Sequence, residues 1–283
     1  MSSTTRGATT PDAPSIHPLA ALLRGFAIDF ITAHDLTAVS RIMAPDYCLS
    51  IGGHTLDGRD SQYLPPTAAQ IEQFPGLCVT VHDVMYGEDA IAMQFTEHGR
   101  SSRHDFRGAT WRGISLFRTD GERMRWGWAE EDYFARKSQL ASGVCDAVDP
   151  PHATPWDVQP ELPDAGVEEV ARDWLRRPEK IADIPHAHWI SKVDPLPEKL
   201  IDFNTVEKVE IDTLFSAANR VAFHLAYHGS YAGGFSDIDS GAVGEPTILR
   251  AAGMLTIRRG EVVDARITTD RLGFYRSLLK SRK

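Results

Sequence analysis

The spacing of apolar residues changes along the first half of the chain. Between residues 16 and 33 they recur mostly every three or four positions, which predicts an amphipathic helix. A short helix is expected at 36–43, ended by Ala44-Pro45 because the residue before a proline disfavours helical backbone. From Tyr47 the pattern becomes extended, and strands are predicted at 77–86, 90–98, 109–118 and 123–131, followed by a helical stretch at 133–140.

The second half of the chain repeats this plan. Ile91-Ala-Met-Gln-Phe-Thr-Glu-His-Gly99 matches Val221-Ala-Phe-His-Leu-Ala-Tyr-His-Gly229, with Ala, His and Gly in the same places. A repeat of this kind is longer than a solenoid unit of roughly 20–50 residues, so it predicts a duplicated domain. The expected elements are a helix at 167–177, shorter helical segments to about 201, strands at 206–215, 219–228, 246–258 and 261–269, and a terminal helix from Arg271.

Proline marks the expected boundary between the copies. The segment 141–166 has little apolar periodicity and contains Pro150, Pro151, Pro155, Pro160 and Pro163, which favours a semi-extended linker. We therefore expect a disordered lead-in at 1–15, domain one at 16–140 and domain two at 167–283. Helices followed by a curved antiparallel sheet make each domain an α+β fold.

Composition narrows the classes of function. Hydrophobic residues make up 42% of the chain and charged residues 24%, as in soluble globular proteins. The formal net charge of −9, without a Lys/Arg cluster, argues against nucleic-acid binding. No apolar run reaches the ~20 residues of a membrane span, and residues 1–14 lack the apolar core of a signal peptide. The three cysteines are expected to be reduced thiols, which favours a cytoplasmic protein.

Several segments resemble the nuclear-transport-factor-2-like superfamily, and within it the SnoaL-like polyketide cyclase branch. The segments that carry the resemblance are His34-Asp35-Leu36, Ala44-Pro45-Asp46-Tyr47, Gly58-Arg59-Asp60, Phe74-Pro75-Gly76-Leu77, Ile91 through Gly99, and Gly113 through Arg118; in the second copy they are 219–235 and 253–279. The resemblance implies two tandem cone-shaped domains, each with a pocket closed by helices. Relatives include cyclases, ketosteroid isomerases, dehydratases, epoxide hydrolases and lyases, as well as proteins that only bind.

The resemblance also implies how such a pocket works. These relatives move protons with an Asp, Glu or His in an apolar cavity, without metal or organic cofactor, because burial raises a carboxyl pKa towards the working range. They usually pair through their sheets as dimers. The duplication would therefore build a pseudo-dimer into one chain, and a homodimer of that chain stays open.

Strand alternation sorts the candidate residues in each copy. In 90–98 the apolar face carries Met93, Phe95 and Glu97, which should turn towards the cavity, while His98 faces away. The matching strand of copy two turns His224 and His228 away, so the repeated histidine, His98 in copy one and His228 in copy two, is expected to be structural or to lie at an interface between sheets.

The last strand of copy one suggests the chemistry. Trp126, Trp128, Glu130 and Asp132 share one face in strict alternation, which would set two indole walls beside two carboxylates. Asp132 could equally cap the following helix. Outside this strand, Trp111 is a candidate third wall, and Tyr47 is either a hydrogen-bond donor at the pocket mouth or a buried, satisfied phenol.

Copy two lacks the paired tryptophans, and its Asp270 resembles a helix cap, so copy one is expected to be the working domain. His186 and His188 have no acidic or Cys partner at useful spacing, which argues against a metal. Motifs for nucleotide phosphates and for a serine nucleophile are missing from the sequence.

These observations predict a cofactor-independent acid–base enzyme of lyase, isomerase or cyclase type. Its substrate would be a hydrophobic, ring-bearing small molecule. Glu130 or Asp132 would be the base, Tyr47 or Glu97 its polar partner, and Phe95 and Met93 would line the pocket with the indoles. Two alternatives remain: a non-catalytic binding or association module, and an epoxide hydrolase, which needs an Asp-Arg-Asp set around a water.

Overall fold

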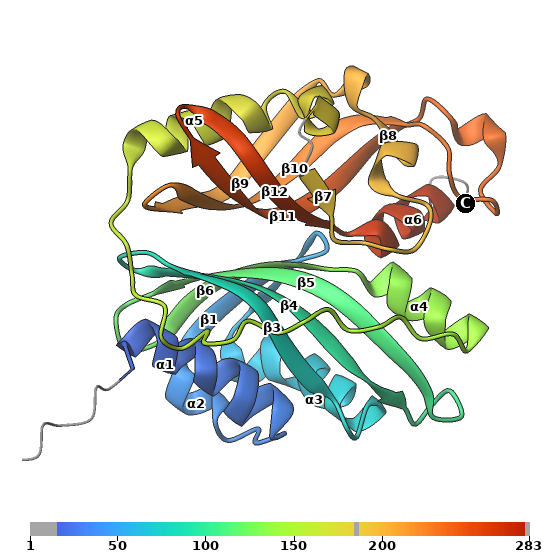
Figure 1. Ribbon diagram of the computed structural model, residues 1–283. Coiled ribbons are helices and arrows are strands. Elements are labelled where there is room, and N and C mark those ends of the chain that lie inside the picture. The colour runs from blue at the N-terminus through green and yellow to red at the C-terminus, as the bar shows by residue number, and fades with distance from the viewer. Residues whose placement is uncertain (1–15, 184–186, 281–283) are drawn as a thin grey trace, which may run out of the picture.

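The computed structural model describes residues 16–183 and 187–280, so the lead-in expected at 1–15 lies outside the described residues. The chain forms two α+β units, and each has a six-stranded sheet (Figure 1). The two sheets face one another. Helices α1 to α3 cover the face of one sheet that points away from the other sheet, and helix α5 covers the corresponding face of the second sheet (Figure 1). We call this helix-covered face of each sheet its inner face and the opposite face its outer face.

Unit one begins with α1 (Pro18–Arg24), which continues directly into a π-helical stretch, Gly25–Thr32. Its other elements are α2 (Val39–Ile42), β1 (Met43–Ile51), β2 (His54–Asp57), α3 (Leu64–Gln73), β3 (Cys78–Tyr86), β4 (Ala90–Ser101), β5 (Arg107–Thr119), β6 (Met124–Glu131) and α4 (Tyr133–Ser142). The strand order is β2-β1-β6-β5-β4-β3, with β1 parallel to β6 and the other neighbours antiparallel. Strands β4, β5 and β6 therefore supply the central floor of the unit.

Unit two repeats the sheet. Its elements are α5 (Ala165–Leu175), β7 (Ala187–Trp189), β8 (Ile201–Asp202), β9 (Lys208–Ala217), β10 (Arg220–Tyr231), β11 (Pro246–Arg258), β12 (Glu261–Thr269) and α6 (Arg271–Lys280). The order is β7-β12-β11-β10, with β8 and β9 both pairing with β10, and β7 runs parallel to β12 as β1 does to β6. Between α5 and β9 the predicted helical segments are short 3₁₀ turns and the two short strands.

Both faces of each sheet are buried in the middle of the molecule. The inner face of each sheet packs on its own unit's helices. The outer faces pack on each other through Met85, Ala90, Ala92, Ile114 and Leu116 from unit one and Phe215, Ala217, Ala222, Ala252 and Met254 from unit two. Small alanines bring the two sheets close together. An apolar strand face in this protein therefore does not by itself identify the cavity side.

The chain between α4 and α5 crosses unit one along the edge strand β3 (Figure 1). The amide of His152 donates to the carbonyl of Val81 at 2.8 Å, and the amide of Glu161 donates to that of Tyr86 at 3.0 Å. These bonds occupy backbone groups of an edge strand that could otherwise pair with another chain.

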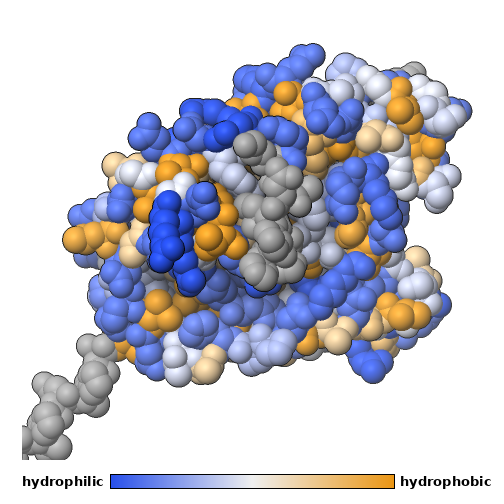
Figure 2. Space-filling model, turned by 45° about the horizontal axis from the view of Figure 1, so that its top comes forward, coloured by the Kyte–Doolittle hydropathy of each residue, from blue (hydrophilic) through white to orange (hydrophobic). Residues whose placement is uncertain are grey.

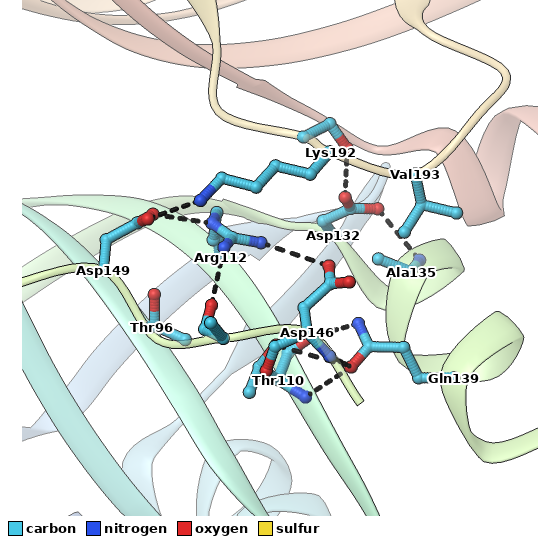
Figure 3. A network of polar contacts seen from close by, with 12 residues as sticks. Thr96, Thr110, Arg112, Asp132, Ala135, Gln139, Asp146, Asp149, Lys192 and Val193 are labelled. Carbon is cyan, nitrogen blue, oxygen red and sulfur yellow. Dashed lines mark hydrogen bonds and ion pairs between the residues drawn. The ribbon is translucent and has the colours of Figure 1, made fainter. Parts of the chain in front are cut away.

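Buried Arg112 on β5 fixes the same segment. Its guanidinium lies 3.0 Å from Asp149 and 3.5 Å from Asp146, and Lys192 of unit two also binds Asp149 (Figure 3). One arginine thus ties the linker to unit one, and the linker in turn contacts unit two.

The surface mixes polar and apolar residues. On the face presented in Figure 2, hydrophilic and hydrophobic residues are interspersed. Among the described helices, none has the length and apolar character needed to cross a bilayer.

Candidate active site in unit one

A cavity of about 400 Å³ lies between the sheet and the helices of unit one. Its walls are mostly apolar and aromatic, as expected of a small-molecule site. The apolar and aromatic lining residues are Phe26, Ile31, Tyr47, Leu49, Ile51, Leu56, Tyr63, Pro66, Ala69, Phe95, Phe117, Ala129 and Tyr133. The titratable groups among the remaining lining residues are Glu97, Glu131, Arg103 and Arg136.

The two carboxylates come from strands that flank β5. Glu97 on β4 pairs with Trp111 on β5, and Glu131 on β6 pairs with Gly113, two residues further along β5. The indole Nε1 of Trp111 donates a hydrogen bond to Glu131 at 2.9 Å. Side chains two positions apart on a strand share a face, so Glu97, Trp111 and Glu131 lie on the inner face together.

Helices α3 and α4 complete the polar group. Gln70 on α3 donates from Nε2 to Glu97 at 2.7 Å, and its Oε1 accepts from Arg136 of α4 at 2.8 Å. The Arg136 guanidinium lies 4.9 Å from the centre of the Trp111 ring and 4.3 Å from that of Tyr133. A chain of direct contacts therefore runs from one carboxylate to the other through Gln70, Arg136 and Trp111.

The surroundings of the two carboxylates differ. Burial, and then the negative charge of Glu131, raise the pKa of Glu97 well above its ordinary value. Burial also raises the pKa of Glu131, but hydrogen bonds from Tyr133 and Trp111 and the charge of Arg136 oppose the increase. We conclude that Glu97 holds its proton more strongly than Glu131. Two such groups are suited to act as acid and base respectively.

The inner face of β4 is as the sequence predicts. Phe95 and Glu97 line the cavity, whereas Met93 and Trp111, also expected to line it, pack in the core of unit one and are not among its lining residues. Trp111 is fully buried and touches Glu131 through its indole nitrogen. Tyr47 on β1 lines the cavity, and no described residue forms a hydrogen bond with its hydroxyl.

The Tyr47 ring occupies space that a side chain on β6 would otherwise fill. A Cβ added at Gly127 would lie 2.1 Å from the Tyr47 hydroxyl oxygen. Glycine at this position is therefore what allows the phenol to reach the cavity.

The placement expected for β6 is wrong. Trp128 and Glu130 point away from the cavity towards unit two, and Trp126 stacks on Trp128 with its side chain 40% exposed. A bulge at Arg125 is the reason: Met124 pairs with Thr119 and Trp126 with Arg118, so one extra residue interrupts the alternation. Beyond the bulge, Ala129 and Glu131 face the cavity instead.

Glu130 belongs to the interface between the units. Its Oε1 accepts from Nε2 of His224 at 3.0 Å, and Nδ1 of the same ring lies 2.7 Å from Asp212. His224, which alternation turns away from the cavity, thus lies between the sheets, whereas the repeated His228 contacts Glu210 at 2.8 Å near the surface. His98 faces away from the cavity too and bonds Thr80 at 3.0 Å.

Asp132 also points away from the cavity. Its Oδ1 caps α4 by accepting from the amide of Ala135 at 3.1 Å, and both of its oxygens bind Arg271 of unit two. The capping alternative is thus the correct one, and the predicted placement of Asp132 as a base in the cavity is wrong. The Asp132 side chain is buried where the two units meet. From there it both caps the first turn of α4 and binds Arg271.

Four residues of the cavity were not predicted from the sequence: Glu131, Arg136, Gln70 and Tyr133. The sequence contains two adjacent carboxylates, Glu130 and Glu131. Strict alternation assigned Glu130 to the cavity face, whereas Glu131 is the one that lies there. Arg136 lies one helical turn after Asp132, on the α4 face that meets the sheet, and this position was the only signal for it in the sequence.

Unit two has its inner space filled by aromatic rings. Phe235 packs against Tyr231, Phe274, Tyr275 and, from α4 of unit one, Phe134, with centroids 5.1–6.3 Å apart. Asp270 accepts from the amide of Gly273 at 2.7 Å at the start of α6, as a cap does.

Within the described ranges 16–183 and 187–280, no three His, Cys, Asp or Glu side chains are grouped as a metal site would require. His186, considered with His188 from the sequence, lies outside the described residues.

In the comparison with family models, residues 23–126 match the SnoaL-like domain. This segment, which runs from α1 to the first part of β6, includes most of the residues that line the cavity. It is a SnoaL-like domain. The comparison with curated proteins found no match.

Solved structures similar to this chain share low sequence identity with it. IdmH from Streptomyces antibioticus, described as a candidate polyketide cyclase, is 18% identical, with a TM-score of 0.39 over 44% of this chain and 98% of its own. A Catenulispora acidiphila protein with a ketosteroid isomerase-like fold is 18% identical, with a TM-score of 0.39 over 47% and 95%. An epoxide hydrolase from M. tuberculosis, described as LEH-like, is 14% identical, with a TM-score of 0.39 over 46% and 95%.

Proposed function

We propose that the SnoaL-like unit is a cofactor-independent acid–base enzyme of isomerase, lyase or cyclase type. The observation that supports this most is the pair of buried carboxylates, Glu97 and Glu131, inside one apolar cavity. Their pKa values are raised by burial, and Glu97 is raised further by the charge of Glu131. A proton can be exchanged at such groups near neutral pH, where exposed carboxylates are fully ionised.

In the proposed reaction Glu131 is the base. It takes a proton from a carbon next to a carbonyl group, and the electron pair of the broken C–H bond moves towards the carbonyl oxygen. The protonated Glu97 donates a hydrogen bond or its proton to that oxygen, and the Tyr47 hydroxyl is a second donor. The resulting enol or enolate can then shift its double bond, close a ring or expel a leaving group.

The cavity also favours a class of substrate. Its walls carry aromatic rings from Phe26, Tyr47, Tyr63, Phe95 and Phe117. A volume of about 400 Å³ accommodates one small ring-bearing molecule. We propose a hydrophobic cyclic ketone as the substrate class.

Deuterium uptake tests the proposal without knowledge of the natural substrate. The protein is incubated in D₂O with a panel of cyclic ketones, and exchange next to the carbonyl is followed by mass spectrometry. Glu131→Gln should reduce uptake by roughly 10²-fold or more, because the base is removed. Glu130→Gln is the matched control from the same strand and should retain uptake.

The pH dependence is a further readout. Because Glu131 must be ionised and its pKa is raised, the acidic limb of the rate profile should lie above pH 4.5, the ordinary glutamate value. Stoichiometric binding of the ketones without exchange, unchanged by Glu131→Gln, would instead support the non-catalytic binder.

Epoxide hydrolysis is a second candidate, supported by a different feature of the cavity. Arg136 reaches Glu97 through Gln70 and contacts Trp111, which binds Glu131. Two carboxylates with a guanidinium are the groups needed to activate a water and protonate an epoxide oxygen. Incorporation of ¹⁸O from labelled water into a diol product of cyclohexene oxide would favour this reaction over proton transfer.

Three free thiols fit our further proposal that the protein works in a reducing compartment such as the cytoplasm. Cys48 is buried, Cys78 half-buried and Cys145 exposed, and none forms a disulfide in the described part of the chain.

A further inference from the structure

A second cavity lies where the two units meet, apart from the cavity of unit one. Its volume is about 500 Å³. Unit one contributes the β1–β2 turn and the start of α4, and unit two contributes the start of β11 and helix α6. Ile51 and Tyr133 line both cavities and so form the wall between them. We call this second cavity the junction pocket.

The junction pocket is rich in positive charge although the chain as a whole carries −9. Arg250, Arg276 and Lys280 line it, together with His54. In the described part of the chain, no carboxylate forms an ion pair with any of those three cations. Among the described lining residues, three cations face one space and Asp270 is the only carboxylate.

Asp270 supplies one negative charge against three cations, and the charges of Arg250 and Arg276 act on it. It is 6% exposed, burial raises its pKa, and one of its oxygens accepts from the amide of Gly273. Arg250 also acts on the buried Glu130 behind the pocket and lowers the pKa of that group. Among the described residues, neither Arg276 nor Lys280 forms an ion pair, although the charge of Arg276 acts on Asp270.

A buried hydroxyl supplies an independent indication of a ligand. Thr247 lines the pocket, is 9% exposed, and its Oγ1 is buried with no hydrogen-bond partner among the described residues. An unmade hydrogen bond of this kind costs about 1–3 kcal/mol, so buried hydroxyls are normally paired. A ligand oxygen would satisfy it.

The β1–β2 turn gives the pocket its shape. Gly53 has a φ of +77°, and a Cβ there would lie 2.7 Å from the Arg250 guanidinium carbon. Glycine lets the turn adopt this conformation and approach the guanidinium directly. The remaining walls include the apolar residues Ile51, Pro246, Ile248 and Leu272.

We propose that the junction pocket binds a small organic oxyanion, a carboxylate or a phosphate monoester, with an apolar body. Arg276 and Lys280 hold the anionic group, Thr247 donates a hydrogen bond to one of its oxygens, and the apolar body lies on Ile248 and Leu272. This site is separate from the carboxylate pair of unit one and does not depend on the reaction proposed there.

Calorimetric titration of the full chain at low ionic strength tests the proposal. The probes are phenylphosphate and benzoate, with phenol as the neutral analogue of equal ring size. One equivalent of an anionic probe should bind, and phenol should bind far more weakly. Tighter binding of phenylphosphate would assign the phosphate class, and tighter binding of benzoate the carboxylate class.

Variants locate the binding. The double substitution Arg276→Gln with Lys280→Gln should weaken anion binding by about tenfold or more, because two charge-assisted contacts are lost. Both side chains are exposed, so the fold should persist. Thr247→Val, of similar shape, should weaken binding by a smaller factor. Arg258→Gln, an exposed arginine outside the pocket, is the control.

Several outcomes would overturn the proposal. They are the absence of anion binding, equal binding of phenol, or an equal effect of Arg258→Gln, which would indicate a general response to charge. Glu131→Gln should leave probe binding unchanged. Altered binding in that variant, and tighter binding above all because a negative charge is removed, would place the anion in the unit one cavity instead.

Discussion

At the scale of single residues, Asp132 shows how one carboxylate can serve two elements. It begins α4 by accepting from the amide of Ala135, and it holds Arg271, whose side chain is fully buried, from the other unit. Arg271 also donates to the carbonyl of Pro195 at 2.9 Å. A buried arginine without its carboxylate would be an uncompensated charge.

Asp132→Ala should therefore lower the free energy of unfolding by about 3–5 kcal/mol, from the stranded guanidinium and the lost cap. Urea unfolding of the full chain measures this. Asp46→Ala is the control, because that carboxylate binds Arg125 at the surface, where ion pairs contribute about 0–1 kcal/mol. Equal losses in both variants would contradict the role assigned to Asp132.

At the scale of elements, most of the plan could be predicted from the chain. The periods of 3.6 and 2 residues give α1, α4, α6 and all the long strands within a few positions, because these elements bury one face against a continuous core. The inner face of β4 also followed from alternation, which placed Glu97 correctly.

The face of β6 could not be predicted in the same way. A bulge at Arg125 leaves no signature in the apolar pattern, and both faces of the sheet are buried, one by helices and the other by the second sheet. The sequence alone therefore does not indicate which face of the sheet carries Trp128 and which carries Glu131. The partners of Glu131 come from α4, whose packing on the sheet is a tertiary contact that single-sequence periodicity does not contain.

The interface strands carry a titrating pair, Glu130 on β6 and His224 on β10. Burial raises the pKa of Glu130 to about 7. Burial alone would lower the pKa of His224, but hydrogen bonds to Asp212 and Glu130 outweigh it and raise the value to about 9. A group whose pKa is raised by folding stabilises the fold at low pH and loses that contribution as pH rises.

The free energy of unfolding should consequently fall as pH rises from 6.5 to about 9, by roughly 3 kcal/mol for His224 alone. His224→Gln should flatten this part of the stability curve. Chemical unfolding at several pH values measures the slope in both proteins. An unchanged slope in His224→Gln would show that the pair does not titrate as described.

At the scale of the whole molecule, the chain behaves as two units with one shared interior. The contact between the sheets joins apolar residues from both units, and it contains the Glu130–His224 and Asp132–Arg271 pairs. Cutting the chain at the linker would expose this face and leave buried charges of one unit without partners. The units should therefore depend on each other for stability.

Residues 1–142 expressed alone should be poorly soluble or unfold at a lower temperature than the full chain. Co-expression with 143–283 should restore a one-to-one complex, detectable by light scattering. If residues 1–142 alone form a soluble monomer with the thermal stability of the full chain, the interface is not essential.

The two carboxylates in the cavity of unit one are the central feature of the proposed function. Their ionisation can be measured directly by NMR titration of protein labelled with ¹³C at the glutamate side-chain carboxyls. We predict that Glu97 titrates well above ordinary glutamates, and that Glu131→Gln lowers its pKa by removing a neighbouring negative charge. Glu130→Gln should leave the Glu97 titration in place. A Glu97 resonance that titrates near 4.5, unchanged by Glu131→Gln, would contradict the central claim.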